Sequence, residues 1–356
     1  MTTVNHFVVL FVATFICVND VFSQCQATTP PREQAASEQM AHEQAAREQT
    51  EWIGTLIAPD AEAFVLGTGY GFCEGPAADP VGNIYFSDGK KNAIHFYPYG
   101  REVQLFTDRT IDANGMMFGP LGESHVVHGP ELFVCEGAAY RVSAYDTRTG
   151  ERRTIAEGID GGRFNEPNDL AIDRFGGFYF TDPNYRHGGQ ETVRKEDTYY
   201  CSAEGVVSRV STVCKKPNGV LLSPDGSRLY LADNGDSRIY VYDVAGPGKL
   251  ENERSWAKTI GGPDGMTCDA QGNLYVCCGP KGVEIFASDD PSRRAMLGRD
   301  RGIGYASNCV FGGPDRKVLY ITAADAFLGI QMNVAGMVPV CAVPANAASV
   351  NNRLNP

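Results

Sequence analysis

A strand-and-turn pattern that recurs six times constrains this chain more than any other feature of its sequence. Each copy has a turn with Asp or Gly, then aromatic and aliphatic residues, and often a small residue followed by Asp, as in DPVGNIYFSD from Asp79. Six aromatic residues, separated by 48, 46, 51, 45 and 45 residues, mark equivalent positions: Tyr85, Phe133, Tyr179, Tyr230, Tyr275 and Tyr320. This spacing is the length of a four-stranded blade, so the sequence predicts an all-β, six-bladed β-propeller.

Other architectures with short elements fit the pattern less well. A hairpin-rich sandwich also has strands and turns, but it lacks the long-range period. Helical repeats are excluded because the strands alternate with a period of two. Closing six blades into a ring buries sheet edges that separate halves would expose, so we expect residues 55–345 to fold as one domain. Residues 346–356 then form a C-terminal tail.

Two segments precede the repeats. Residues 1–23 contain an apolar run from Phe7 to Val18 and end in Ser23, which is typical of a cleaved signal peptide and predicts a secreted or periplasmic protein. No Lys or Arg precedes the run, so an uncleaved anchor or a misassigned start is the alternative. Residues 24–54 include a five-residue repeat rich in Glu, Gln and Ala, which favours a helix without an apolar face. We expect a solvated spacer, helical or disordered, and deletion of residues 24–50 is expected to leave activity intact.

Composition limits the partners. The net charge is -12 and the 31 Lys and Arg residues are scattered, which excludes a nucleic-acid partner. No later apolar stretch is long enough to cross a membrane once the signal peptide is removed. The ten cysteines that then remain permit disulfides, and Cys201 with Cys214 is the expected pair because they flank a hairpin through Gly205. No Cys-x-x-Cys motif supports a thiolate zinc site.

One oxygen-bearing side chain precedes each aromatic marker at a nearly constant distance. The offsets are 11, 19, 11, 12, 11 and 12 residues for Glu74, Asn114, Asn168, Asn218, Asp264 and Asn308. Each alone is typical of a turn, but the repetition places all six at one level around the propeller axis. Carboxylate and amide oxygens without His or Cys favour one Ca²⁺ ion, with Mg²⁺ or Mn²⁺ next and Zn²⁺ last. A dication also compensates two carboxylates that would otherwise repel each other.

The ordered set of motifs resembles the gluconolactonase and senescence-marker-protein (regucalcin) family. The likeness spans about residues 70–330 and is carried by these segments: EGP at Glu74, PNDLAIDRFGGFYFTDPNY at Pro167, PNGVLLSPDGSRLYLAD at Pro217, DGMTCDAQGNLYV at Asp264 and NCVFGGPDRKVLYITAA at Asn308. The resemblance implies a lactonase that hydrolyses glucono-1,5-lactone or a related aldonolactone. It also implies a single metal, bound by Glu74, Asn168, Asn218 and Asp264.

The second blade carries the expected substrate contacts. The segment ANGM at Asn114, followed by CEG at Cys135 and by Arg141, resembles the corresponding part of the family. By that resemblance Asn114, Glu136 and Arg141 contact the small-molecule lactone. Additional residues between Asn114 and Phe133 depart from the even spacing of the other blades.

The expected chemistry needs a polarised carbonyl and a delivered water, and a metal with open coordination sites provides the first. Asp264 is the expected catalytic base, because a ligand carboxylate can share its second oxygen with that water. Asp169, beside Asn168, is the alternative base. The chain has no Gly-x-Ser-x-Gly motif, which argues against a serine esterase. Two other functions stay open: a non-catalytic propeller that calcium stabilises, and a related hydrolase acting on another ester, such as a phosphotriester.

Overall fold

The computed structural model describes residues 32–119, 131–185 and 195–338. The predicted signal peptide (residues 1–23) and the predicted tail (residues 346–356) lie outside them. The chain divides into two compact units, residues 1–48 and 49–356. A helix, α1 (Arg32–Leu56), comes first, and all the described strands belong to the second unit.

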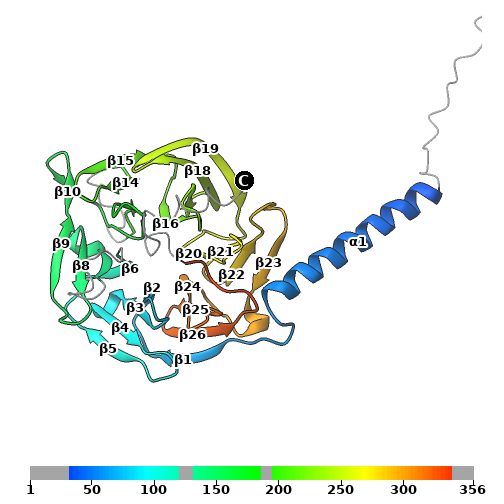
Figure 1. The fold of residues 1–356 in the computed structure, drawn as a ribbon, viewed down its shortest axis with the longest axis horizontal. Coiled ribbons are helices and arrows are strands. Elements are labelled where there is room, and N and C mark those ends of the chain that lie inside the picture. The colour runs from blue at the N-terminus through cyan, green and yellow to red at the C-terminus, as the bar shows by residue number, and fades with distance from the viewer. Residues whose placement is uncertain (1–31, 120–130, 186–194, 339–356) are drawn as a thin grey trace, which may run out of the picture. The chain divides into compact units, whose positions relative to one another are not determined.

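Six four-stranded antiparallel sheets form the blades of a propeller (Figure 1). The first three blades contain β2 (Cys73–Ala78), β3 (Ile84–Asp88), β4 (Ala93–Tyr97) and β5 (Gln104–Thr107); β6 (Ala113–Phe118), β7 (Glu131–Glu136), β8 (Arg141–Asp146) and β9 (Arg152–Ala156); and β12 (Leu170–Ile172), β13 (Phe178–Asp182), β14 (Asp197–Cys201) and β15 (Val207–Ser211). The strands β10 (Gly158–Ile159) and β11 (Gly162–Arg163) form a separate hairpin.

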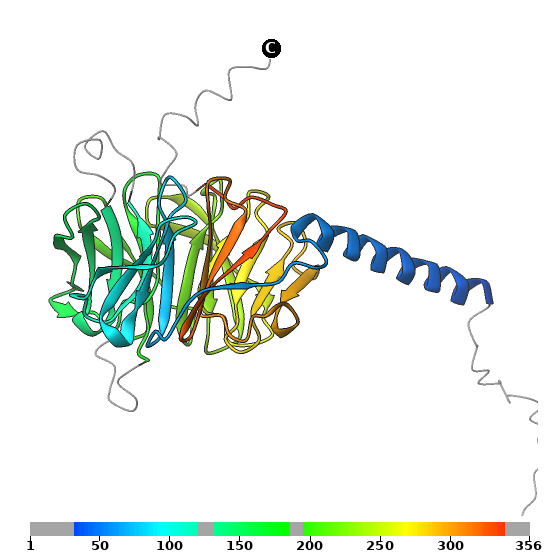
Figure 2. The ribbon, with the colours of Figure 1, turned by 90° about the horizontal axis from the view of Figure 1, so that it is seen from below.

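The other three blades follow the same order, from the axis outward. They contain β16 (Pro217–Leu222), β17 (Arg228–Asp233), β18 (Arg238–Gly246) and β19 (Lys249–Lys258); β20 (Met266–Cys268), β21 (Leu274–Cys277), β22 (Val283–Phe286) and β23 (Arg294–Leu297); and β24 (Asn308–Gly312), β25 (Val318–Ala323), β26 (Ala326–Gln331) and β1 (Phe64–Thr68). Seen edge-on, the strands run between the two faces of the ring (Figure 2).

The sixth blade joins the two ends of the propeller. Its outer strand is β1, which pairs antiparallel with β26 through Phe64 opposite Gly329 and Thr68 opposite Ala326. In Figure 1, β1 in blue therefore lies beside β26 in red. This pairing covers the edge of β26 and closes the ring, and β1 becomes the outer edge strand of the sixth blade.

The six aromatic markers confirm the predicted six-bladed propeller. Each lies on the second strand of its blade, and none is more than 7% exposed. They pack between neighbouring blades. The ring of Phe133 meets that of Phe178 in the next blade edge to face, with centroids 5.7 Å apart, and Tyr275 meets Phe311 in the same way at 5.1 Å. The repeat detected in the sequence is thus the repeat of this inter-blade core.

The boundary predicted between spacer and propeller needs a correction. Residues 49–54 belong to the propeller unit, since Trp52 and Ile53 pack against the core and Leu56 and Ile57 are 0% and 2% exposed. Gln49 Nε2 also donates a hydrogen bond to Arg294 O at 2.7 Å. The five-residue repeat has no apolar stripe, but the residues that end the helix have one, and they bury it.

The expected disulfide between Cys201 and Cys214 is absent. All eight cysteines of the described residues are free and buried. Cys201 packs with Phe178 and Phe180 in the core between blades two and three, whereas Cys214 packs with Val220 in the core between blades three and four. The two thiols therefore lie on opposite faces of one blade. In the described part of the chain, no helix has the length and hydrophobicity to span a membrane.

The division of α1 predicts different effects for its two parts. Deleting residues 24–48 is expected to leave the unfolding temperature of the propeller unchanged. Leu56→Ala is expected to lower the free energy of unfolding by about 2–5 kcal/mol, because it opens a cavity in the core. Met40→Ala is the matched control, since Met40 is 64% exposed. Circular dichroism measures the unfolding temperature of the truncated chain and, in urea titrations, the free energy of unfolding of Leu56→Ala and Met40→Ala. Equal stability of these two variants would show that the helix end does not pack on the core.

Candidate active site

The six oxygen-bearing residues predicted near the axis, here called the axial residues, share one register. Each lies opposite the residue two positions after its aromatic marker. Glu74 pairs with Ser87 and Asn308 with Thr322, while the Asn168 and Asp264 N–H groups donate to Thr181 O at 2.9 Å and Cys277 O at 2.8 Å. Asn114 and Asn218 lie at the same register position, because Ala113 pairs with Glu136 and Pro217 pairs with Asp233.

Glycines after several axial residues let neighbouring inner strands approach closely. In blades one, two and four the ladder is irregular at this point, where Gly75, Gly115 and Gly219 follow the axial residue. A Cβ on Gly219 would collide with the carbonyl oxygen of Asp264 in the next blade. Only a residue without a side chain fits there, so these glycines bring consecutive axial residues together.

A carboxylate at the end of the second strand orients the loop that leads to the axial residue. Asp182 accepts the N–H groups of Asn165 and Glu166, both at 2.8 Å, and these residues lie three and two positions before Asn168. The same bonds join Asp88 to Gly71 and Phe72 before Glu74, and Asp233 to Lys215 and Lys216 before Asn218. The sequence shows that many copies of the repeat end in a small residue followed by Asp, but the role of this Asp in positioning the loop was not predicted.

Glu136 and Arg141 do not occupy the places predicted for them. Glu136 ends the second strand of its blade, as Asp88 does in the first, and accepts the N–H of Ile111 at 3.0 Å. Its side chain is 0% exposed and binds Arg141 at 2.8 Å, with Ser143 and Tyr145 donating further hydrogen bonds. Neither Glu136 nor Arg141 lines the cavity at the axis. The substrate-contact prediction is corrected for both, because Glu136 takes the loop-orienting position.

Five axial residues converge on one cavity of about 680 Å³, here called the active-site cavity. They are Glu74, Asn114, Asn168, Asn218 and Asp264, which include all four predicted metal ligands. The sixth, Asn308, lines a different pocket on the axis, together with Asp169. Blade six has no irregularity after Asn308, so its register continues unbroken into β24.

The two axial carboxylates, Glu74 and Asp264, are electrostatically strained. Burial raises the pKa of Glu74 well above its ordinary value, and the neighbouring charge of Asp264 raises it further. Burial also raises the pKa of Asp264 to about 7, although the amide of Asn218 hydrogen-bonds to this carboxylate and opposes the shift. A positive charge between these two groups would stabilise both ionised forms.

Two amide oxygens of the cavity, those of Asn168 and Asn218, also lack a hydrogen-bond donor among the described residues. The Asn168 side chain is 8% exposed and makes no hydrogen bond to another described residue. Asn218 Nδ2 donates to the Tyr185 hydroxyl at 2.8 Å, and among the described residues no group donates to its Oδ1. Two carboxylates and two such amide oxygens fit a hard divalent cation. In the same part of the chain, no cluster of three or more His, Cys, Asp or Glu residues provides another metal site.

Other residues of the cavity wall were not predicted from the sequence. Tyr185, Tyr305, Asn234 and Lys90 all line the active-site cavity. The Lys216 ammonium lies 5.2 Å from the centre of the Tyr185 ring, and the Asn234 side chain donates to Pro263 O at 3.2 Å. These residues come from the loops between strands, which carry no repeat signal.

Known proteins resemble the chain over most of the propeller. The profile of the family described as SMP-30/Gluconolactonase/LRE-like region matches residues 72–325. A gluconolactonase of Zymomonas mobilis is 28% identical over 303 residues, which is 76% of this chain and 82% of that protein. A diisopropyl-fluorophosphatase of Loligo vulgaris is 31% identical over 182 residues, which is 46% of this chain and 55% of that protein. A solved gluconolactonase from Xanthomonas campestris superposes with a TM-score of 0.67 at 25% identity, covering 77% of this chain and 90% of that one.

The raised pKa of Asp264, about 7, predicts how metal-free protein responds to pH. The folded state holds this proton more tightly than the unfolded state, so stability is present at low pH and is lost as pH rises through about 7. We expect the free energy of unfolding in chelator to fall between about pH 4 and pH 7, and added Ca²⁺ to reverse the loss. Asp264→Asn should flatten the dependence. Denaturant titrations at each pH test this, and a stability that rises with pH would contradict it.

Proposed function

The chain belongs to the SMP-30/gluconolactonase/LRE-like family, and we propose that it hydrolyses a sugar lactone with one bound divalent cation. The main observation in support is that the two axial carboxylates and three axial carboxamides converge on one cavity of about 680 Å³. This volume is usual for a small-molecule site. The similarity to the gluconolactonases of Zymomonas mobilis and Xanthomonas campestris supports this reaction class.

Glu74, Asn168, Asn218 and Asp264 are the proposed ligands of the cation, and Ca²⁺ is the proposed ion. The donors are all oxygen atoms, and the two carboxylates match the charge of a dication. The pKa of each carboxylate is raised when no cation is present, which supports a site built around positive charge. When bound, the cation polarises the lactone carbonyl and acidifies a nearby water.

Asp264 is the proposed general base. Its carboxylate lines the active-site cavity, where it can accept a proton from the attacking water. The water oxygen bonds to the carbonyl carbon, the ring C–O bond breaks, and the departing oxygen takes up a proton to give the hydroxy acid. Asp169 lines only the other pocket, and its Oδ1 accepts the N–H of Leu170 at 2.9 Å. The position of Asp169 therefore favours Asp264 as the general base.

The cavity wall supports a polyhydroxylated substrate. Amide, hydroxyl and ammonium groups surround the axial residues, from Asn92, Asn114, Asn234, Tyr185 and Lys90. Such groups can exchange hydrogen bonds with ring hydroxyls, and a buried group left without its partner would disfavour an unsubstituted lactone. We therefore propose an aldonolactone such as glucono-1,5-lactone as the substrate.

Hydrolysis of a phosphotriester is the second candidate, because the diisopropyl-fluorophosphatase of Loligo vulgaris matches part of the chain. A non-catalytic propeller is the third. A pH-stat assay separates them when chelated and Ca²⁺-restored protein is given glucono-1,5-lactone, an unsubstituted δ-lactone and diisopropyl fluorophosphate. We expect acid release from the aldonolactone only with cation present. Preference for the phosphate ester, or no turnover of any substrate, would overturn the proposal.

The role of Asp264 predicts that Asp264→Asn separates binding from turnover. Asn keeps an oxygen for the cation but cannot accept the proton, so the rate is expected to fall by about 10² or more while calorimetry still detects Ca²⁺ binding. Asp169→Asn is the matched control and should keep a rate within about threefold of wild type. Normal turnover by Asp264→Asn together with an inactive Asp169→Asn would assign the base to Asp169.

A further inference from the structure

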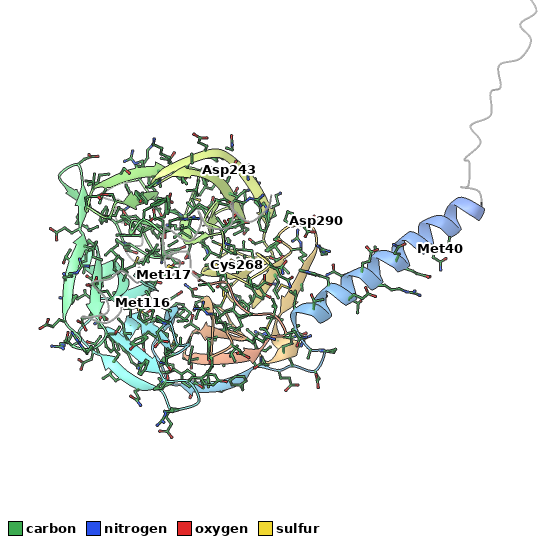
Figure 3. The ribbon with its side chains drawn as sticks, in the orientation of Figure 1. Met40, Met116, Met117, Asp243, Cys268 and Asp290 are labelled. Atoms are coloured by element: carbon green, nitrogen blue, oxygen red, sulfur yellow. The ribbon has the colours of Figure 1, made fainter. Side chains whose placement is uncertain are left out.

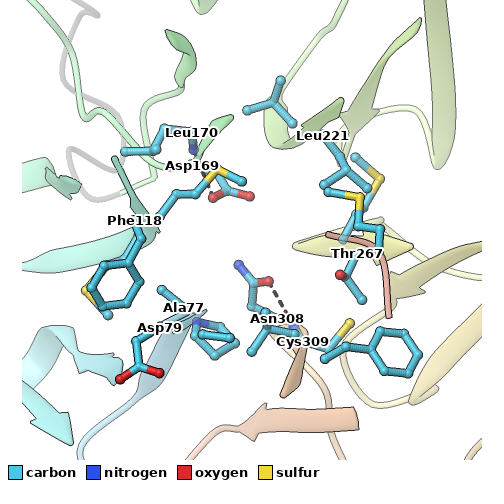
Figure 4. Close-up of a pocket in the computed structure, with 18 of the residues that line it drawn as sticks. Ala77, Asp79, Phe118, Asp169, Leu170, Leu221, Thr267, Asn308 and Cys309 are labelled. Carbon is cyan, nitrogen blue, oxygen red and sulfur yellow. Dashed lines mark hydrogen bonds between the residues drawn. The ribbon is translucent and has the colours of Figure 1, made fainter. Parts of the chain in front are cut away.

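A second pocket lies on the propeller axis, on the far side of the axial residues. It has a volume of about 100 Å³, and the inner strands of all six blades contribute to its wall. Figure 4 shows Ala77, Phe118, Leu170 and Leu221 around its open centre. We call it the axial pocket. The proposed reaction uses none of its side chains.

The axial pocket is rich in thioethers. Four of the eight methionines of the chain line it: Met116, Met117, Met266 and Met337. Figure 3 places Met116 and Met117 near the centre of the ring. Methionine side chains are flexible and polarizable, and they adapt to apolar ligands of varied shape. The wall is well anchored, because the Cys268 thiol contacts Met337 Sδ at 3.0 Å and the Met337 N–H donates to Cys268 O at 3.1 Å.

Arg316 places a positive charge at the rim of this pocket. It is half-buried, and the neighbouring residues Pro314 and Asp315 are exposed, so the rim faces solvent. Its Nη1 donates to Met337 O at 2.9 Å, and among the described residues no carboxylate forms an ion pair with it. Partial burial lowers the pKa of the guanidinium. A half-buried guanidinium with free N–H groups is suited to a carboxylate, which it can bind through two parallel hydrogen bonds.

The acidic groups of the pocket limit the charge of a ligand. Asp79 also lines it, but its oxygens accept hydrogen bonds from Val81 N, Asn83 N and Asn83 Nδ2 at 2.8–3.0 Å. At the inner end, Figure 4 shows Asp169 and Asn308, which are 7% and 6% exposed. A second negative charge at this end would meet a buried carboxylate in an apolar setting, which is unfavourable.

We propose that the axial pocket binds a short aliphatic monocarboxylate, with its carboxylate on Arg316 and its chain among the methionines. An apolar cavity of about 150 Å³ holds one benzene molecule, so about 100 Å³ suits a chain of roughly three to four carbons beyond the carboxylate. Butyrate and pentanoate have this size. The site is separate from the active-site cavity, and the proposal does not depend on the reaction catalysed there.

Methyl NMR of the full chain labelled with ¹³C-methyl methionine tests the proposal directly. Titration with pentanoate should shift the signals of Met116, Met117, Met266 and Met337 and leave Met40 unchanged. Affinity should rise roughly three- to fourfold for each methylene from acetate to pentanoate and then stop rising. Pentylamine lacks the anionic head, glutarate carries a second charge and gluconate lacks an apolar chain. None of the three is therefore expected to shift these signals.

Two variants test the role of the charge. Arg316→Gln is expected to weaken pentanoate binding by about tenfold or more, because it removes a charged hydrogen-bond donor. Lys317→Gln removes the same charge at the next residue, which does not line the pocket, and should change affinity by less than about twofold. Equal binding of pentanoate and pentylamine by the wild type would overturn the proposal, even if Arg316→Gln fails to fold. So would unchanged affinity in Arg316→Gln, or shifts confined to methionines outside the pocket.

Discussion

The burial of two carboxylates at the propeller axis is the constraint on which the candidate site depends. Glu74 and Asp264 come from blades one and five. Burial raises the pKa of both carboxyl groups, and the charge of Asp264 raises the pKa of Glu74 further. Such a pair is unfavourable in a protein interior unless a positive charge lies nearby. The amide oxygens of Asn168 and Asn218, which have no donors among the described residues, complete a set of oxygen atoms that fits a divalent cation.

The surrounding structure holds these groups together through backbone contacts. Glycines at Gly75, Gly115 and Gly219 remove the side chains that would keep the inner strands apart. Hydroxyl groups then join one blade to the next: Ser87 Oγ donates to Asn114 O at 2.9 Å, and Thr181 Oγ1 donates to Asn218 O at 2.6 Å. Since both acceptors are carbonyls of axial residues, the positions of these two axial residues depend on the neighbouring blade as well as on their own.

The fold and the common register of the axial residues could be predicted from the sequence because both repeat with the blade. The aromatic markers recur every 45 to 51 residues and the axial residues every 40 to 54, and the register of the strands places them equivalently. Features without a repeat were not predicted, such as the loop residues Tyr185 and Tyr305 in the cavity wall. Glu136 was misread because a carboxylate at a strand end and a carboxylate at a substrate look alike in sequence. The missing disulfide depends on which blade face each cysteine occupies, which spacing alone does not report.

The pairing of β1 with β26 has a consequence for how the protein is made. Phe64 and Gly329 lie 265 residues apart, so the first strand of the propeller must wait for the synthesis of all the other blades before it finds its partner. Blades one to five can assemble from neighbouring segments as they leave the ribosome, but the ring cannot close until β26 has been synthesised. Until then blade six is absent and the edge of β1 is uncovered, so the nascent chain passes through an open, aggregation-prone intermediate. A chain truncated before β26 therefore cannot close the ring, because it lacks the strand that pairs with β1.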